Sequence, residues 1–134
     1  MATTTHRPST PERTVLLQRT AAGIAVFIAV LYGLIWAGAL TVVDQAEVGD
    51  LGILGVAGVV FLVLAALLWR FASRVLWIGT AVLQAVMIWM YVVISAERDP
   101  PFEVWGISIR VAQVALIGVL VTLLVQGTRR GRRG

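Results

Sequence analysis

Apolar residues occur in four long runs separated by short polar stretches. The runs cover residues 21–43, 51–69, 75–95 and about 104–126. Each run is long enough for a helix to cross a hydrocarbon core of about 30 Å, which takes roughly 20 residues. The polar stretches between the runs are short, so we expect sequential helices to lie beside each other in opposite directions. The pattern therefore predicts an all-α integral membrane protein, a four-helix bundle with up-down topology.

The composition supports a membrane environment. Of the 134 residues, 59% are hydrophobic and 13% are charged, and the mean hydropathy is +0.91. A soluble domain of this size could not bury so much apolar surface, because small domains keep a large share of their residues at the boundary. Every basic residue is arginine, and alanine, valine and glycine are abundant. This usage is typical of a GC-rich bacterial genome, so we expect the protein in the bacterial inner (cytoplasmic) membrane.

The charged residues divide between two sets of polar stretches. Arginines precede the first run, lie between the second and third runs, and follow the fourth run. Acidic residues dominate the stretch between the first and second runs and the stretch between the third and fourth runs. Because positive residues stay on the cytoplasmic side, both termini are expected in the cytoplasm. The arginines of the first set are Arg7, Arg13, Arg19, Arg70, Arg74, Arg129, Arg130, Arg132 and Arg133. The acidic residues of the second set are Asp44, Glu47, Asp50, Glu97, Asp99 and Glu103.

Some of these arginines are the expected contacts with anionic lipid headgroups, at about 1 kcal/mol per arginine near a membrane surface. Their simplest role is to anchor the orientation of the chain. They flank apolar runs instead of forming a basic stripe along a soluble face, so no nucleic acid is expected as a partner. The expected headgroup ligands are Arg70, Arg74, Arg129, Arg130, Arg132 and Arg133.

The two ends of the chain are polar and are expected to lie outside the bundle. We expect residues 1–10 to form a disordered tail, residues 11–126 to form the bundle and residues 127–134 to form a polybasic tail. Thr10 and Pro11 have the residue types of a helix N-cap and a first helical residue, which places the start of the first helix at Pro11.

The first apolar run also imitates a cleavable signal peptide. Arg13 and Arg19 precede it, and the small residues of the sequence AGA lie within it at positions 37–39. The run exceeds 20 residues, however, whereas the apolar region of a signal peptide has roughly 7–15. We therefore expect this run to remain in the protein as a membrane span.

Arg110 places a positive charge inside the opening turns of the fourth run, about 9 Å from its start at about 1.5 Å per residue. Helical side chains lean toward the N-terminus of their helix, and Gly106 has no side chain to block that path. We expect the guanidinium to snorkel toward the outer headgroups and to pair with a carboxylate. Glu103 is the first candidate, and Asp99, Glu97 and the acidic residues between the first and second runs are alternatives. Contact with an anion or a substrate is the alternative role of Arg110.

Two buried amides are expected to join the third and fourth helices. Gln84 lies near the middle of the third run and Gln113 lies about two turns into the fourth. Antiparallel packing brings them to similar depths, so we predict a hydrogen bond between them, with Thr80 nearby, worth about 0.6 to 2 kcal/mol. A ligand-binding role for the two amides is the alternative.

Small residues recur at every fourth position of the first run. Such a ridge lets another helix approach closely by van der Waals packing. We expect either tight packing against the second helix, which has glycines in its first half, or an interface with another protein. The ridge includes Ala25, Ala29, Gly33 and Ala37. The glycines of the second run are Gly52, Gly55 and Gly58.

The sequence contains no recognisable catalytic arrangement. Its single histidine, His6, lies in the polar tail without a second metal ligand, and cysteine is absent. No cofactor is expected. The middle of each run lacks the ionisable residue that ion-coupled carriers generally need.

These observations predict a small multi-pass inner-membrane protein without catalytic activity. We expect an accessory, structural or assembly subunit that acts through helix–helix contacts, with itself or with a larger membrane-protein complex. The alternative is a small oligomeric transporter, pore or holin-like permeabiliser.

Overall fold

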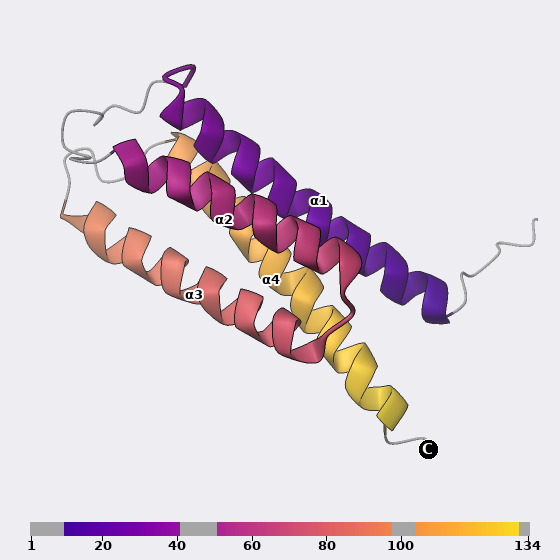
Figure 1. Cartoon of the computed structure of the whole chain (residues 1–134). Coiled ribbons are helices and arrows are strands. Elements are labelled where there is room, and N and C mark those ends of the chain that lie inside the picture. Colours follow the sequence, from indigo (N-terminus) through magenta and orange to yellow (C-terminus); the bar gives the residue numbers. More distant parts are fainter. Residues whose placement is uncertain (1–9, 41–50, 98–103, 132–134) are drawn as a thin grey trace, which may run out of the picture.

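The computed structural model describes residues 10–40, 51–97 and 104–131, and every regular element within them is an α-helix. Each of these helices is long and apolar enough to cross a membrane, as the sequence predicts. They lie side by side in one bundle (Figure 1). The helices are α1 (Thr10–Trp36), α2 (Leu51–Arg70), α3 (Arg74–Ala96) and α4 (Val104–Gly131).

The helices pack against one another unequally. α1 packs most extensively against α2, and α4 packs against both α1 and α3. α2 and α3 have little contact, although only residues 71–73 join them. α1 and α4 therefore hold the bundle together, whereas α2 and α3 each have a single extensive neighbour.

Contacts of α1 with α2 define the two ends of the bundle. In the first half of α1, the Gln18 Nε2 donates a hydrogen bond of 2.6 Å to the carbonyl oxygen of Leu68, in the last turn of α2. At the end of α1, Trp36 lies against Gly55, where an added Cβ would be 3.2 Å from the indole Nε1. We call the end of the bundle at which α2 ends and α3 begins the α2–α3 end. The α3–α4 end is the opposite one, where α3 ends and α4 begins.

The interior differs in chemistry between the helices. α1, α2 and α4 contribute mainly aliphatic side chains, whereas the buried residues of α3 are Trp77, Thr80, Gln84 and Ser95. α3 therefore contributes most of the buried polar side chains of the described residues, beside Gln18 of α1 and Gln113 of α4. The largest fully buried apolar side chains are Ile28, Phe61, Leu68, Leu116, Leu120 and Leu123.

The first helix ends earlier than predicted. The apolar run of residues 21–43 predicts a span of that length, but α1 ends at Trp36. Gly38 has a φ of 71°, a left-handed conformation that glycine adopts without steric cost. The backbone N–H groups of Gly38 and Ala39 donate back to the last turn of α1, at 3.0 and 2.9 Å. This is a Schellman motif, so the sequence AGA ends a helix.

The other helix bounds agree closely with the predicted runs, with one exception. α2 and α3 lie within one residue of the predicted bounds at each end. α4 continues from the predicted end at residue 126 to Gly131. The start of the predicted polybasic tail is therefore helical.

Candidate functional site

A polar cluster centred on Arg110 joins three helices near the α3–α4 end. The Arg110 Nη1 donates a hydrogen bond to the Gln113 Oε1, and its Nη2 lies 3.5 Å from the Tyr32 hydroxyl of α1. The Arg110 Cζ is 4.4 Å from the centre of the Tyr91 ring of α3. The Gln113 Nε2 lies 3.8 Å from the Met87 Sδ, also on α3. These five residues form the Arg110 cluster.

A close approach of α3 to α4 places the ring of Tyr91. A Cβ on Gly106 would lie 2.9 Å from the Tyr91 Cζ, closer than real contacts allow. Glycine at this position leaves the space that the phenol ring occupies. The ring then covers the guanidinium of Arg110, a cation–π arrangement worth about 2 kcal/mol when it is desolvated.

The guanidinium of Arg110 does not follow the predicted route to the membrane surface. That route passes over Gly106, and the ring of Tyr91 occupies it. The guanidinium bonds instead to Gln113, three residues further along α4. The prediction of a snorkelling arginine is therefore wrong, because an aromatic ring from a neighbouring helix fills the path.

The predicted carboxylate partners of Arg110 lie largely outside the described residues. Glu103 and Asp99 are both in that part of the chain, so their pairing with Arg110 stays a prediction. Glu97 is exposed at the C-cap of α3. The positive charge of Arg110 is stabilised in the cluster by uncharged side chains. Gln113 and Tyr32 accept hydrogen bonds from the guanidinium, and the ring of Tyr91 attracts it through its quadrupole.

The predicted hydrogen bond between Gln84 and Gln113 is not formed. The Gln113 Oε1 accepts from Arg110, and its Nε2 faces Met87. The bond from the guanidinium to the oxygen of Gln113 is charge-assisted and therefore stronger than a bond between two amides. The two polar side-chain atoms of Gln84 and the Oγ1 of Thr80 are buried without a hydrogen-bond partner.

The ridge of small residues lies between α1 and α2. A Cβ on Gly58 would lie 3.5 Å from the Ala29 carbonyl oxygen and 3.7 Å from the Gly33 nitrogen. Ala25 and Ala29 are buried, whereas Ala37 is exposed beyond the end of α1. Of the two expected roles of the ridge, the packing of α1 against α2 is the one that occurs within this chain.

Polar contacts also join α1 to α2 at the α2–α3 end. The Arg19 Cζ lies 5.1 Å from the centre of the Trp69 ring. Arg70 and Arg74 are exposed on either side of the connection between α2 and α3. Their contact with lipid headgroups stays a prediction. The remaining expected headgroup ligands, whose side chains lie outside the described residues, are Arg129, Arg130, Arg132 and Arg133.

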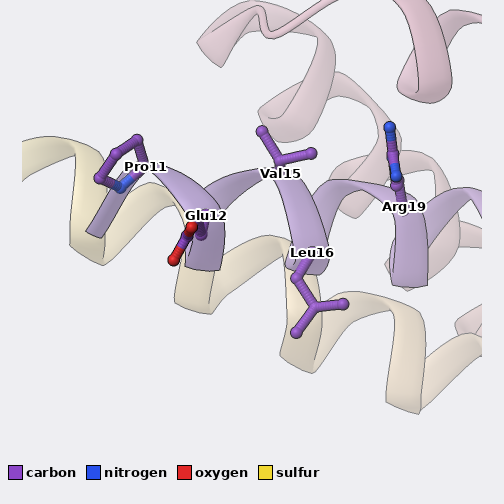
Figure 2. A pocket seen from close by; sticks show the side chains of 5 residues that line it. All are labelled: Pro11, Glu12, Val15, Leu16 and Arg19. Atoms are coloured by element: carbon purple, nitrogen blue, oxygen red, sulfur yellow. The ribbon is translucent and has the colours of Figure 1, made fainter. Parts of the chain in front are cut away.

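A surface pocket of about 380 Å³ lies along the first turns of α1 (Figure 2). It is lined by Pro11, Glu12, Val15, Leu16 and Arg19, all from one helix. In Figure 2 the side chains of Val15 and Arg19 point to one side of α1 and that of Leu16 to the other. The pocket is therefore an open helix surface and not an enclosed site.

A second pocket, of about 340 Å³, lies between α3 and α4 beside Arg110. Apart from Tyr91 and Arg110, aliphatic side chains of the two helices line it. It brings no carboxylate or second cation to the cluster. Within residues 10–40, 51–97 and 104–131, no group of three potential metal ligands gathers. The chemistry available at the cluster is thus hydrogen bonding and one positive charge.

Three members of the Arg110 cluster are not distinguished by the sequence pattern. Tyr32, Met87 and Tyr91 occupy positions that equally suit lipid-facing or space-filling side chains. The one local signal was Gly106, which permits close approach of another helix. Comparison of the chain with protein-family models, with curated proteins and with solved structures finds no match.

Proposed function

We propose that the chain is a non-catalytic protein of the bacterial inner membrane that acts through helix–helix contacts, as an accessory or assembly subunit. The unequal packing of α2 carries this proposal. α2 packs extensively against α1 and only slightly against α3, whereas a helix in a four-helix bundle ordinarily packs against two neighbours. One apolar side of α2 is therefore available to another protein helix. Val59 and Val63 of α2 are 60% and 53% exposed.

A photo-crosslinking amino acid at position 59 is expected to join the chain to another protein, because α2 lacks a second extensive neighbour. The measurement is irradiation of intact membranes, followed by extraction in mild detergent and identification of the adduct by mass spectrometry. Val121 is the matched control, since it is 47% exposed on α4, which packs against two helices.

The crosslinked product can be a second copy of the chain or a different membrane protein, and either supports the proposal. Lipid adducts alone at position 59, together with a monomeric extract, would contradict it. Equal protein adducts from positions 59 and 121 would also contradict it, because the contact would then not be specific to α2.

The arrangement that we propose is up-down, with both termini in the cytoplasm. The contacts of Gln18 with Leu68 and of Trp36 with Gly55 support opposite directions for α1 and α2. The arginines at both ends of the sequence and at the α2–α3 end support a cytoplasmic location for that end. Alkaline phosphatase fused to either terminus is expected to be inactive, whereas green fluorescent protein is expected to fluoresce. Phosphatase activity at one terminus only would mean an odd number of crossings.

A second candidate function is a small oligomeric transporter or pore, and the polar groups of α3 favour it. Trp77, Thr80 and Gln84 put hydrogen-bonding atoms into the interior of the bundle. Solute leak from liposomes that contain the purified protein distinguishes the two candidates. Vesicles that stay tight favour the accessory role, and protein-dependent leak favours transport.

A further inference from the structure

α3 presents a row of buried polar atoms to the interior of the bundle. Trp77, Thr80 and Gln84 are 7%, 2% and 0% exposed. They are separated by three and four residues, so they lie on one face of the helix. The Trp77 Nε1, the Thr80 Oγ1 and both polar atoms of the Gln84 side chain are buried without a hydrogen-bond partner.

The row continues toward the α3–α4 end through the Arg110 cluster. Met87 lies one turn beyond Gln84 and is contacted by the Gln113 Nε2 at 3.8 Å. Gln113 accepts from Arg110, whose Nε is also buried without a partner. From Trp77 to Tyr91, which covers the guanidinium, the row extends about 21 Å at about 1.5 Å per residue.

Thr80 differs from other threonines in how its hydroxyl is used. Thr20, Thr122 and Thr128 each donate to the backbone carbonyl four residues earlier, at 2.9, 2.8 and 3.1 Å. The same bond is open to Thr80 by helix geometry, yet its Oγ1 has no partner. Its hydroxyl is therefore available to a group in the interior.

Leaving this row unsatisfied would be costly. A buried polar group without a hydrogen bond costs several kcal/mol in a hydrocarbon environment, where no solvent can reach it from outside. A molecule that fits the row must both donate and accept hydrogen bonds, since the row contains an indole N–H, a hydroxyl and an amide. Along Trp77, Thr80 and Gln84 it should also be uncharged, because these three residues provide no charge to oppose its own.

We propose that the interior face of α3 binds a row of ordered water molecules, from the indole of Trp77 to the guanidinium of Arg110. A water molecule can donate two hydrogen bonds and accept two, and it is small enough to fit between packed helices. It supplies acceptors to the indole, to the Gln84 amide N–H groups and to the Arg110 Nε, and donors to the Gln84 carbonyl. The inference goes beyond the proposed function and does not depend on a protein partner.

Radiolytic hydroxyl-radical footprinting of the protein in lipid nanodiscs tests this inference. Radicals formed from bound water oxidise the methionine beside it, so Met87 is expected to react several-fold faster than Met90. Met90 is the matched control: it lies three residues away on the same helix and is 54% exposed on the surface that lipid covers. Met90 is also nearer the α3–α4 end, so radicals that enter from bulk solvent there would reach it first.

The double variant Thr80→Val with Gln84→Leu is expected to slow the oxidation of Met87 to the rate of Met90. Circular dichroism and a monodisperse elution profile establish that the variant is folded. If Met87 reacts no faster than Met90 in the unsubstituted protein, the row is dry and the proposal is overturned. An unchanged Met87 rate in the folded double variant overturns it as well, because the water would then not be held by α3. The first comparison needs no variant, so a misfolded double variant leaves the test intact.

Discussion

Replacing Gln113 by leucine is expected to lower the free energy of unfolding by about 3 kcal/mol, because it removes the acceptor of a charged group inside the bundle. In the folded protein the Gln113 Oε1 accepts from the Arg110 Nη1. Leucine has a similar size but cannot accept a hydrogen bond. The guanidinium of Arg110 therefore stays partly buried and loses one hydrogen bond. Equilibrium unfolding in mixed micelles, followed by circular dichroism, measures the change.

The second half of this experiment removes the charge itself. With Arg110→Met in the Gln113→Leu background, most of the lost stability is expected to return, with a coupling of about 2 kcal/mol between the two positions. Gln126→Leu is the matched control on the same helix. The Gln126 Oε1 is buried without a hydrogen-bond partner, so this change is expected to leave the free energy of unfolding unchanged or to raise it. Additive losses at positions 110 and 113 would show that the hydrogen bond contributes nothing.

Gly106→Ala is expected to destabilise the bundle by about 1–3 kcal/mol, the usual cost of overpacking a filled site. The added methyl group would meet the phenol ring of Tyr91, whose Cζ would be 2.9 Å away. Moving the ring also removes it from the guanidinium of Arg110. Thermal unfolding of the purified protein in detergent measures the loss.

Gly118 provides the control for that substitution. It lies on the same helix, and an added Cβ there would have no neighbour within 4 Å. Gly118→Ala is therefore expected to be neutral, or to stabilise by up to about 1 kcal/mol through helix propensity. If Gly106→Ala unfolds at or above the temperature of the unsubstituted protein, the close contact with Tyr91 does not constrain the two helices.

The positions of the helices could be predicted from the sequence because a bilayer imposes a simple requirement. A spanning helix needs about 20 predominantly apolar residues, so the runs alone place α2 and α3 to within a residue. The end of α1 was predicted wrongly because the run of apolar residues continues to residue 43, beyond the end of the helix at Trp36. Gly38, which ends it, lies in the AGA sequence that imitates the cleavage site of a signal peptide.

The polar cluster could be predicted only in part. Arg110, Gln84 and Gln113 stand out because polar groups are rare in apolar runs, and Arg110 and Gln113 do belong to one site. Their partners depend on how the helices rotate about their axes, which a single sequence does not specify. Tyr91 decides the direction of the Arg110 side chain, and it comes from a different helix.

The slight contact between α2 and α3 also bears on the order of events during synthesis. α3 depends on α4 for its extensive packing, and α4 is the last of the four to leave the ribosome. Arg110 and Gln113 belong to α4. Until α4 is synthesised and inserted, these two residues cannot connect α3 to α1. A nascent chain halted before α4 should thus leave its third helix loosely attached and open to membrane proteases.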